Sequence, residues 1–202
     1  LPEGTTSGKD ILGFPLTHTN NGWLNLSGTS ITADDYGYVK IPDNDTLDGH
    51  DAMTWSFWLK PDSLVANNFV ADKRVTDQES WRILINDSSG DLILTVSGDG
   101  STEESQLTTN LTLPLNTWTF VTMIFDSGTF TVYKNNNSAI AIDAHFTSQK
   151  TIFNSTTPVY IGSNADGARH WDGAIDEFRI YNRALTAPEN LKNYKHGLSK
   201  HS

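Results

Sequence analysis

The feature that most constrains this chain is a period of two in its apolar residues. In the segment MTWSFWLK, residues 53–60, one face of an extended strand would carry Met53, Trp55, Phe57 and Leu59. The residues between them would lie on the opposite face, because neighbouring side chains of a strand point to opposite sides. A helix would instead need apolar residues at every third or fourth position. The segment therefore predicts a strand with one buried side.

Ten further segments show similar alternation or a short apolar run. They are WLNLSG, YGYVKI, NFVADK, SWRILIN, DLILTVS, ESQLTTN, TWTFVTMIF, TFTVYKN, PVYIG and DGAIDEFRIY. The pieces between them, such as DSSGD, GDGST, DSGT and NNNS, are rich in residues that favour turns. This many evenly spaced strands predict an all-β fold, either a sandwich or a barrel.

One helix is predicted, over residues 186–197. Thr186 followed by Glu189 forms a capping-box pattern, Pro188 stands in the first turn, and Gly197 is placed to end the helix. The sequence therefore predicts a short surface helix after the last strand.

Composition limits the possible partners. The chain has 202 residues, enough for one core, and a formal net charge of -10 with only 14 Lys and Arg residues. This charge argues against nucleic acid or an anionic membrane surface as the main partner. The absence of cysteine excludes disulfides and thiolate metal sites. No apolar run approaches the roughly 18 residues of a membrane span.

The chain is expected to be a single domain over residues 1–202, with a loose lead-in at residues 1–10. It begins with Leu1 rather than Met, which suggests a mature product or a domain cut from a longer chain. Six Asn-x-Ser/Thr sequons favour an extracellular or cell-surface or virion-surface location.

Three stretches resemble the laminin-G-like jelly rolls of the concanavalin-A-like lectin/glucanase superfamily, in a branch related to pentraxins. They are YVKIPDNDTLDGHDAMTWSFWLKPDSL, LPLNTWTFVTMIFDSGTFTVYKNN and VYIGSNADGARHWDGAIDEFRIYNRALTAPE. The resemblance implies a two-sheet antiparallel jelly-roll β-sandwich with a short C-terminal helix. Proteins of this fold include lectins, glycosidases, lyases and adhesion modules, so the fold alone does not select a function.

Asp176 is the first candidate metal ligand. By strict alternation it shares a face with Phe178 and Ile180, and such a carboxylate needs a cation, several hydrogen-bond donors or a place at the edge of the sheet. The resemblance implies that an aspartate of the last long strand binds a structural calcium ion. Glu177 is expected to point the other way and to form a surface salt bridge with Arg179.

The loop PDNDTLDGHDAM is the expected source of further calcium ligands, because it is rich in oxygen donors. The predicted metal set is Asp176 with Asp48 and Asp51. The alternative is that backbone N–H groups satisfy Asp176, while the acids of the loop are solvated.

Catalysis is not expected. Retaining glycosidases of this fold need paired carboxylates on one strand, whereas the neighbouring Glu103 and Glu104 would face opposite sides of theirs. The six histidines are scattered, and no Gly-x-Ser-x-Gly motif is present.

Ligand binding is expected in the loop SNADGARHWDG. It combines an aromatic plane with charged and amide groups that can bind sugar hydroxyls, at Asn164, Asp166, Arg169, His170 and Trp171. Trp171 has an alternative interpretation, in which it only closes the end of the sandwich.

A second candidate set lies in ADKRVTDQES, where Asp72, Lys73 and Arg74 precede the strand of Arg82. Arg74 is the residue of this set predicted to bind ligand. Trp58, on the polar side of its strand, is predicted either to offer a platform for a sugar or to pack beneath the terminal helix.

Two functions follow from these observations. The first is a non-catalytic, lectin-like adhesion module that binds a glycan or glycoconjugate and carries a structural calcium ion. The second is a structural or decoration subunit of a virion, pilus or surface layer, which assembles with itself or binds a protein scaffold. Neither involves nucleic acid or membrane insertion.

Overall fold

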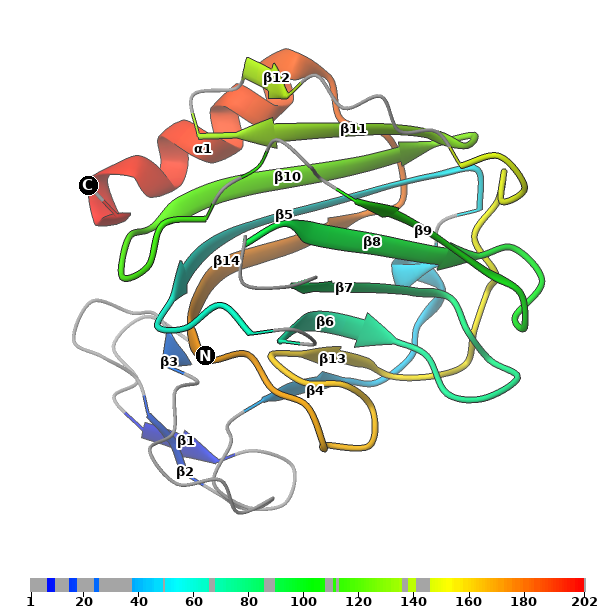
Figure 1. Cartoon of the computed structure of the whole chain (residues 1–202), viewed down its shortest axis with the longest axis horizontal. Helices are drawn as coiled ribbons and strands as arrows, with labels where there is room; N and C mark the ends of the chain where they lie inside the picture. The colour runs from blue at the N-terminus through cyan, green and yellow to red at the C-terminus, as the bar shows by residue number, and fades with distance from the viewer. Residues whose placement is uncertain are drawn as a thin grey trace.

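The computed structural model describes residues 7–9, 15–17, 24–25, 38–48, 50–65, 68–85, 90–107, 111, 113–135, 138–140 and 146–201. Figure 1 shows two antiparallel sheets packed against each other, with a single helix on the outer side of one of them. The predicted jelly-roll β-sandwich with a C-terminal helix is confirmed.

The first sheet has six strands in the order β12-β11-β10-β5-β14-β3. The strands are β3 (Leu24–Asn25), β5 (Ala52–Pro61), β10 (Thr119–Asp126), β11 (Thr129–Lys134), β12 (Ser138–Ile140) and β14 (Gly173–Tyr181). The long strand β5 pairs with β10 on one side and with β14 on the other. The strand predicted from period-two alternation is therefore central in this sheet.

The second sheet also has six strands, in the order β4-β13-β6-β7-β8-β9. The strands are β4 (Val39–Ile41), β6 (Phe69–Lys73), β7 (Trp81–Ile85), β8 (Leu92–Ser97), β9 (Glu103–Leu107) and β13 (Val159–Ile161). A 3-10 turn, Asp45–Leu47, precedes β5. All eleven predicted strand segments overlap a strand of one of the two sheets.

A separate two-stranded ribbon is formed by β1 (Ser7–Lys9) and β2 (Pro15–Thr17). Residues 7–9 of the predicted lead-in thus pair only within this ribbon, and the prediction of a loose lead-in over residues 1–10 stays a prediction. Strands of three residues are too short for a period of two in the apolar residues to be recognised in the sequence.

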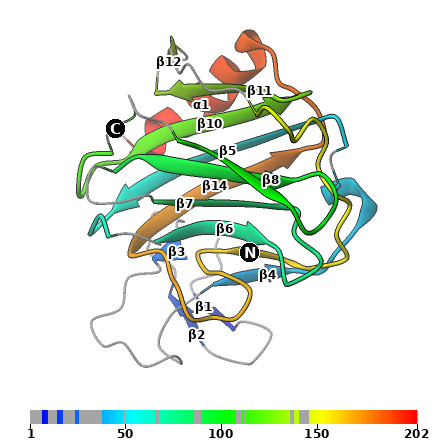
Figure 2. The same cartoon turned by 45° about the vertical axis from the view of Figure 1, so that its right-hand side comes forward.

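The core fills the space between the sheets. Met53, Trp55, Phe57 and Leu59 are fully buried, as their alternation predicts. Thr54, Ser56 and Trp58 on the other face are buried as well, so the prediction of a single buried side is wrong. Trp55 of the first sheet meets Trp81 of the second, with ring centroids 5.2 Å apart. Contacts of this kind join the two layers, which face each other in Figure 2.

The helix α1 (Ala187–His201) begins after Thr186 and runs past the predicted end at residue 197. The backbone N–H of Thr186 donates to Glu189 at 2.9 Å, so the capping interaction forms at the predicted place. The structure describes no helix long and apolar enough to span a membrane.

Gly197 does not end the helix, and the prediction that it would is wrong. A Cβ atom at this position would lie 2.2 Å from Nε1 of Trp58 and 2.9 Å from Oε2 of Glu177. The glycine therefore lets the helix approach the sheet closely, and the chain continues helical to residue 201.

Trp58 packs beneath this helix. It is 2% exposed, and its ring lies 5.7 Å from that of Tyr194 and 4.5 Å from that of His201. The first sheet is therefore covered on its outer side by α1, and Trp58 has no free face for a sugar.

Candidate functional site

A pocket of about 230 Å³ lies where the loop between β13 and β14 meets the end of β6. Its lining residues are Asp72, Arg74, Val75, Thr76, Asn164, Ala165 and Asp166. The loop is the gold-to-orange segment that follows β13 in Figure 1. The structure thus brings together parts of the two candidate sets that the sequence left separate: Arg74 from one, and Asn164 and Asp166 from the other.

The loop is held in a defined shape by its own hydrogen bonds. Ser163 and His170 form an isolated antiparallel bridge, and Asn164 accepts the backbone N–H of Arg169 on its side-chain oxygen at 3.0 Å. Gly167, at the tip, has a φ of 71°, which glycine adopts without strain. This local structure fixes where the polar side chains of the loop stand.

Asp72 is the buried group of the pocket. It alternates with core-facing Ala71 on β6 and therefore points away from the core, yet it is only 2% exposed. One carboxylate oxygen, Oδ2, accepts the backbone N–H of Ala165 at 3.2 Å. The other, Oδ1, is buried and has no hydrogen-bond partner.

Burial raises the pKa of Asp72 from 3.8 to about 7, even though the N–H of Ala165 and the charges of Arg74 and Arg82 act in the opposite direction. Near neutral pH this carboxyl therefore exists in both protonation states. A titratable group of this kind in the wall of a pocket is a common property of binding and catalytic sites.

Two arginines share one carboxylate beside Asp72. Nη1 of Arg74 lies 2.8 and 2.9 Å from the two oxygens of Glu103, and Nη2 of Arg82 lies 3.3 Å from Oε2 of the same residue. Burial lowers the pKa of Arg82, and the charges of Arg74 and Arg169 act in the same direction. The predicted ligand residue Arg74 is therefore part of a charge network around the pocket.

The remaining predicted ligand residues lie in different surroundings. Arg169 and Asp166 are exposed, and His170 is half-buried, with a pKa lowered by desolvation. Trp171 is fully buried and belongs to the core. The prediction that Trp171 binds ligand is therefore wrong, and its alternative, that it closes the sandwich, is correct.

Asp72 was present in the second candidate set but was not selected. Its position in FVADK places it on the outward face, and it stands opposite Arg82 in the register of β6 and β7. Sequence could suggest that pairing only if the neighbouring strand and its register were already known.

The predicted calcium set is not brought together. Among the described residues, one group of three Asp, Glu or His side chains has ligand atoms within 4.8 Å of one another, and it consists of Asp176, Glu177 and His201. Asp48 and Asp51 lie outside it. The grouping of these two residues with Asp176 is therefore wrong in this structure.

Asp48 instead faces a buried ammonium group. Nζ of Lys73 lies 3.1 Å from Asp48 and 2.6 Å from Asp43, and it also donates to the carbonyl of Ser155. The Lys73 side chain is fully buried. A lysine thus stands where a hard cation was expected, while Asp51 is 74% exposed and paired with His50 at 3.1 Å.

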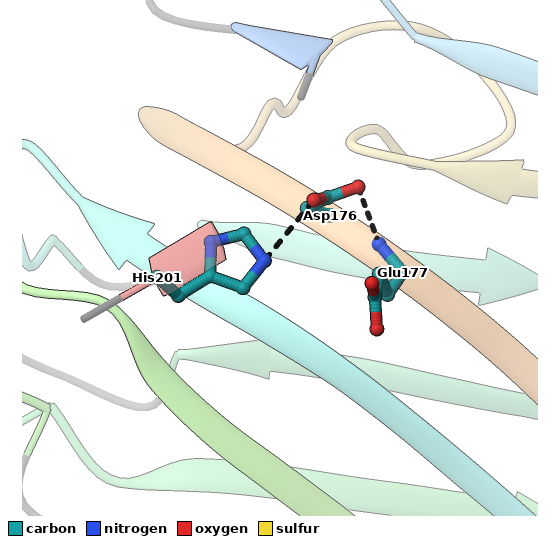
Figure 3. Close-up of side chains that lie close together, drawn as sticks. All are labelled: Asp176, Glu177 and His201. Atoms are coloured by element: carbon teal, nitrogen blue, oxygen red, sulfur yellow. Dashed lines mark hydrogen bonds and ion pairs between the residues drawn. The ribbon is translucent and has the colours of Figure 1, made fainter. Parts of the chain in front are cut away.

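Asp176 meets the end of α1. Figure 3 shows the ring of His201 directed at Asp176, with 3.1 Å between Nε2 and Oδ2, and the backbone N–H of Glu177 donating to Oδ1 at 2.7 Å. Glu177 lies 2.8 Å from Arg179 and 3.1 Å from Lys200.

A β-bulge explains why both carboxylates face the helix. The register of β14 with β5 shifts between Asp176 and Arg179, and Glu177 has a φ of 49°. Phe178 consequently turns to the core and stacks on Phe57 at 5.2 Å. The predicted alternation is therefore wrong at this point. The predicted ion pair between Glu177 and Arg179 forms, but the Glu177 side chain is buried and not on the surface.

This cluster suits calcium poorly. Calcium prefers six to eight oxygen ligands, whereas here one of the three groups is an imidazole and Glu177 is already paired with two cations. The arrangement instead attaches the last turn of α1 to β14, and basic residues near a helix C-terminus are also favoured by the helix dipole. Calcium binding by this chain stays a prediction.

Part of the chain is similar in sequence to an adhesion receptor. The chain is 30% identical over 138 residues to adhesion G-protein coupled receptor V1 of Danio rerio, which is 66% of this chain and 2% of the receptor. The matched region is thus a small part of that protein.

Among solved structures, the binding domain of botulinum neurotoxin DC is similar to this chain in its complexes with rat synaptotagmin II (TM-score 0.63, 18% identity) and with SialylT (TM-score 0.64, 19% identity). Each match covers 90% of this chain and 44% of the other. The heptameric SAP-like pentraxin of Limulus polyphemus matches 78% of this chain and 81% of its own, with a TM-score of 0.54 and 16% identity. These similarities show a shared fold.

The sequence itself matches a family model. Residues 33–189 match the family described as the concanavalin A-like lectin/glucanases superfamily. This range runs from the segment before β4 to the first turn of α1 and includes every residue that lines the pocket. The chain therefore belongs to the concanavalin A-like lectin/glucanase superfamily.

Proposed function

We propose that this chain is a non-catalytic carbohydrate-binding module of an extracellular or cell-surface protein. The observation that carries the proposal is the pocket beside β6, whose wall combines the carboxyl group of Asp72 with the guanidinium group of Arg74 and the amide of Asn164. Oδ2 of Asp72 accepts the backbone N–H of Ala165 at 3.2 Å, which holds the carboxyl group in that wall.

The pocket has a size and lining that fit a sugar residue. Its volume of about 230 Å³ is below the roughly 300–1,000 Å³ of pockets that enclose drug-sized ligands. It would therefore hold one ring or a terminal group, with the rest of a glycan outside. Amide, carboxylate and guanidinium groups at its wall offer both donors and acceptors for hydroxyls.

The similar proteins support a binding role. One is an adhesion receptor, and another is a toxin binding domain solved in complex with SialylT and with synaptotagmin II. A glycan or a protein is thus the kind of partner that this fold is compatible with. The adhesion receptor and the sequons support a location outside the cell.

The state of the two neighbouring glutamates of β9 supports a function without catalysis. Glu103 pairs with two arginines, while Glu104 accepts the backbone N–H groups of Thr147 at 2.6 Å and Ser148 at 2.8 Å. Partial desolvation raises the pKa of Glu104, but these hydrogen bonds and that of Gln149 outweigh it and bring the pKa to about 2. A carboxyl held ionised in this way is a poor proton donor at neutral pH.

A glycan array followed by calorimetry tests the proposal. The blocking variant is Thr76→Trp, because Thr76 is exposed and lines the pocket. The matched control is Thr117→Trp, at an exposed position outside the pocket lining. We expect saturable binding of at least one glycan by the wild type and the control, and at least a tenfold loss in the blocking variant.

The alternative function has its own signature. A regular oligomer in light scattering, with no glycan bound on the array, would contradict the proposal. It would favour a structural or decoration subunit that assembles with itself or with a scaffold.

A further inference from the structure

The imidazole of His201 is held in place at the end of α1. Its side chain is fully buried, and its ring contacts those of Trp58 and Trp118, with centroid distances of 4.5 and 4.4 Å. Nε2 lies 3.1 Å from Oδ2 of Asp176, yet neither ring nitrogen has a hydrogen-bond partner among the described residues. A buried nitrogen in this state lowers stability, and a metal ion between the two atoms would satisfy it.

The bulge of β14 adds a second carboxylate to this imidazole. One ligand atom from each of Asp176, Glu177 and His201 lies within 4.8 Å of the other two. In Figure 3 the imidazole faces Asp176, with Glu177 beside it. Oδ1 of Asp176 accepts the backbone N–H of Glu177 at 2.7 Å, which leaves Oδ2 on the side of the imidazole.

The distances fit two ligand pairs on one zinc ion. With bonds of about 2.0–2.2 Å and tetrahedral angles, two ligand atoms of zinc lie roughly 3.4 Å apart. The separation of Nε2 of His201 from Asp176 is 3.1 Å, and that of Nε2 of His196 from Oε1 of Glu177 is 3.9 Å. The ring of His196 is exposed, so it can rotate toward an ion bound at Glu177.

The donor set selects zinc over calcium. Zinc takes four ligands and binds imidazole nitrogen and carboxylate oxygen, whereas calcium needs six to eight oxygens. Two imidazoles and two carboxylates would complete a zinc site. The Asp176 side chain is 15% exposed, so an ion can approach from solvent although the imidazole of His201 is buried.

Lys200 is the group that zinc has to displace. Its Nζ lies 3.1 Å from Oε1 of Glu177, and its side chain is 45% exposed. Arg179 instead contacts the other oxygen, Oε2, at 2.8 Å. The ammonium group can therefore move into solvent while the guanidinium group stays in place.

We propose that Asp176, Glu177 and His201 bind a structural zinc ion, with His196 as the fourth ligand. The ion would join the last turns of α1 to β14. This inference goes beyond the proposed carbohydrate-binding function and does not rest on it, because the pocket lies beside β6 of the other sheet.

The first experiment titrates the wild type with zinc. The protein is treated with EDTA, dialysed into metal-free buffer and titrated with zinc chloride by calorimetry. We expect one zinc ion per chain and a melting midpoint that rises with the concentration of free zinc. Calcium chloride at the same concentrations should leave the midpoint unchanged. Failure of the wild type to bind zinc would overturn the proposal.

The second experiment removes ligands one at a time. His201→Gln and Asp176→Asn should each weaken zinc binding at least tenfold. The matched controls are His50→Gln and Asp51→Asn, which remove an exposed pair with the same 3.1 Å distance, and they should leave the affinity unchanged. Melts in EDTA establish that all four variants are folded. Unchanged zinc affinity in His201→Gln or Asp176→Asn would overturn the site.

Two further variants test the fourth ligand and the competing cation. His196→Gln should weaken zinc binding, and an unchanged affinity would remove His196 from the site. Lys200→Gln should bind zinc more tightly than the wild type, because the ion no longer competes with an ammonium group for Oε1 of Glu177. A purely structural role of these ion pairs would change the melting midpoint in EDTA and leave the zinc affinity as it is.

Discussion

The outer faces of the two sheets carry similar residues in different states. On the first sheet, Asp176 and Glu177 lie under α1, and both have cationic or N–H partners within 3.1 Å. On the second sheet, Asp72 is more deeply buried, and one of its oxygens has no hydrogen-bond partner. The carboxylates of the first sheet therefore attach α1, whereas Asp72 stands in the wall of a pocket.

The difference separates carboxylates that stabilise the fold from a carboxylate that is a candidate for binding a ligand. Both carboxylates under α1 already have partners, whereas a buried carboxylate oxygen without a partner lowers stability. Asp176 and Glu177 stand out in the sequence as adjacent acids, yet Asp72 of the other sheet is the better candidate for binding because it lines the pocket.

The largest expected effect is on the second sheet. Replacing Asp72 by Asn should raise the free energy of unfolding at pH 8, because a neutral amide avoids burying a charge. The difference between a pKa of 3.8 in the unfolded chain and about 7 in the folded one corresponds to at most roughly 4 kcal/mol.

The pH dependence fixes the sign of this effect. Between pH 4 and 7 the folded wild type binds more protons at Asp72 than the unfolded chain, so the stability contributed by this residue falls as pH rises through that range. Urea unfolding at pH 4 and pH 8 should show the advantage of Asp72→Asn only at pH 8. A variant less stable than the wild type at pH 8, while Asp77→Asn is unchanged, would show that Asp72 has partners after all.

A smaller effect is expected under the helix. Gly197→Ala should lower the free energy of unfolding by about 2 kcal/mol, because its Cβ would collide with Trp58. Helix propensity alone would give a stabilisation of about 1 kcal/mol. Thermal melts should show this loss for Gly197→Ala and a small gain for Ser199→Ala, the control at an exposed position of the same helix. A stabilised Gly197→Ala would contradict the close helix–sheet contact.

The smallest expected effect concerns calcium. Lys73 already supplies a positive charge to Asp43 and Asp48, and two cations already contact Glu177. Melting in EGTA and after restoring millimolar calcium should therefore give the same midpoint. A reversible fall in EGTA would show that the protein binds calcium, and its size would report the affinity by mass action.

Much of the fold was predictable from the sequence. The alternation in residues 53–60 and the capping pattern at Thr186 and Glu189 are local signals, and both correspond to observed elements. The end of α1 was not predictable, because Gly197 is required by the distance to Trp58 on another strand. A local rule for glycine at helix ends cannot include that distance.

The candidate site was predictable in its parts and not in its assembly. Arg74, Asn164 and Asp166 were chosen as polar loop residues, and they do line one pocket. Trp171 was predicted to bind ligand because its ring could pack against a sugar. Its burial in the core depends on how the two sheets pack, which the local sequence does not show. The calcium set failed for a similar reason, because the lysine that pairs with Asp48 comes from a distant strand.

The bulge in β14 has a consequence for how this strand could vary. Asp176 pairs with Trp58 and Arg179 pairs with Ser56, so two residues, Glu177 and Phe178, stand opposite the single residue Phe57. If Glu177 were deleted, one-to-one pairing would be restored with every other side chain on its present face. Glu177 is in this sense a removable insertion, which gives the helix an anchor without altering the pattern of the sheet that carries it.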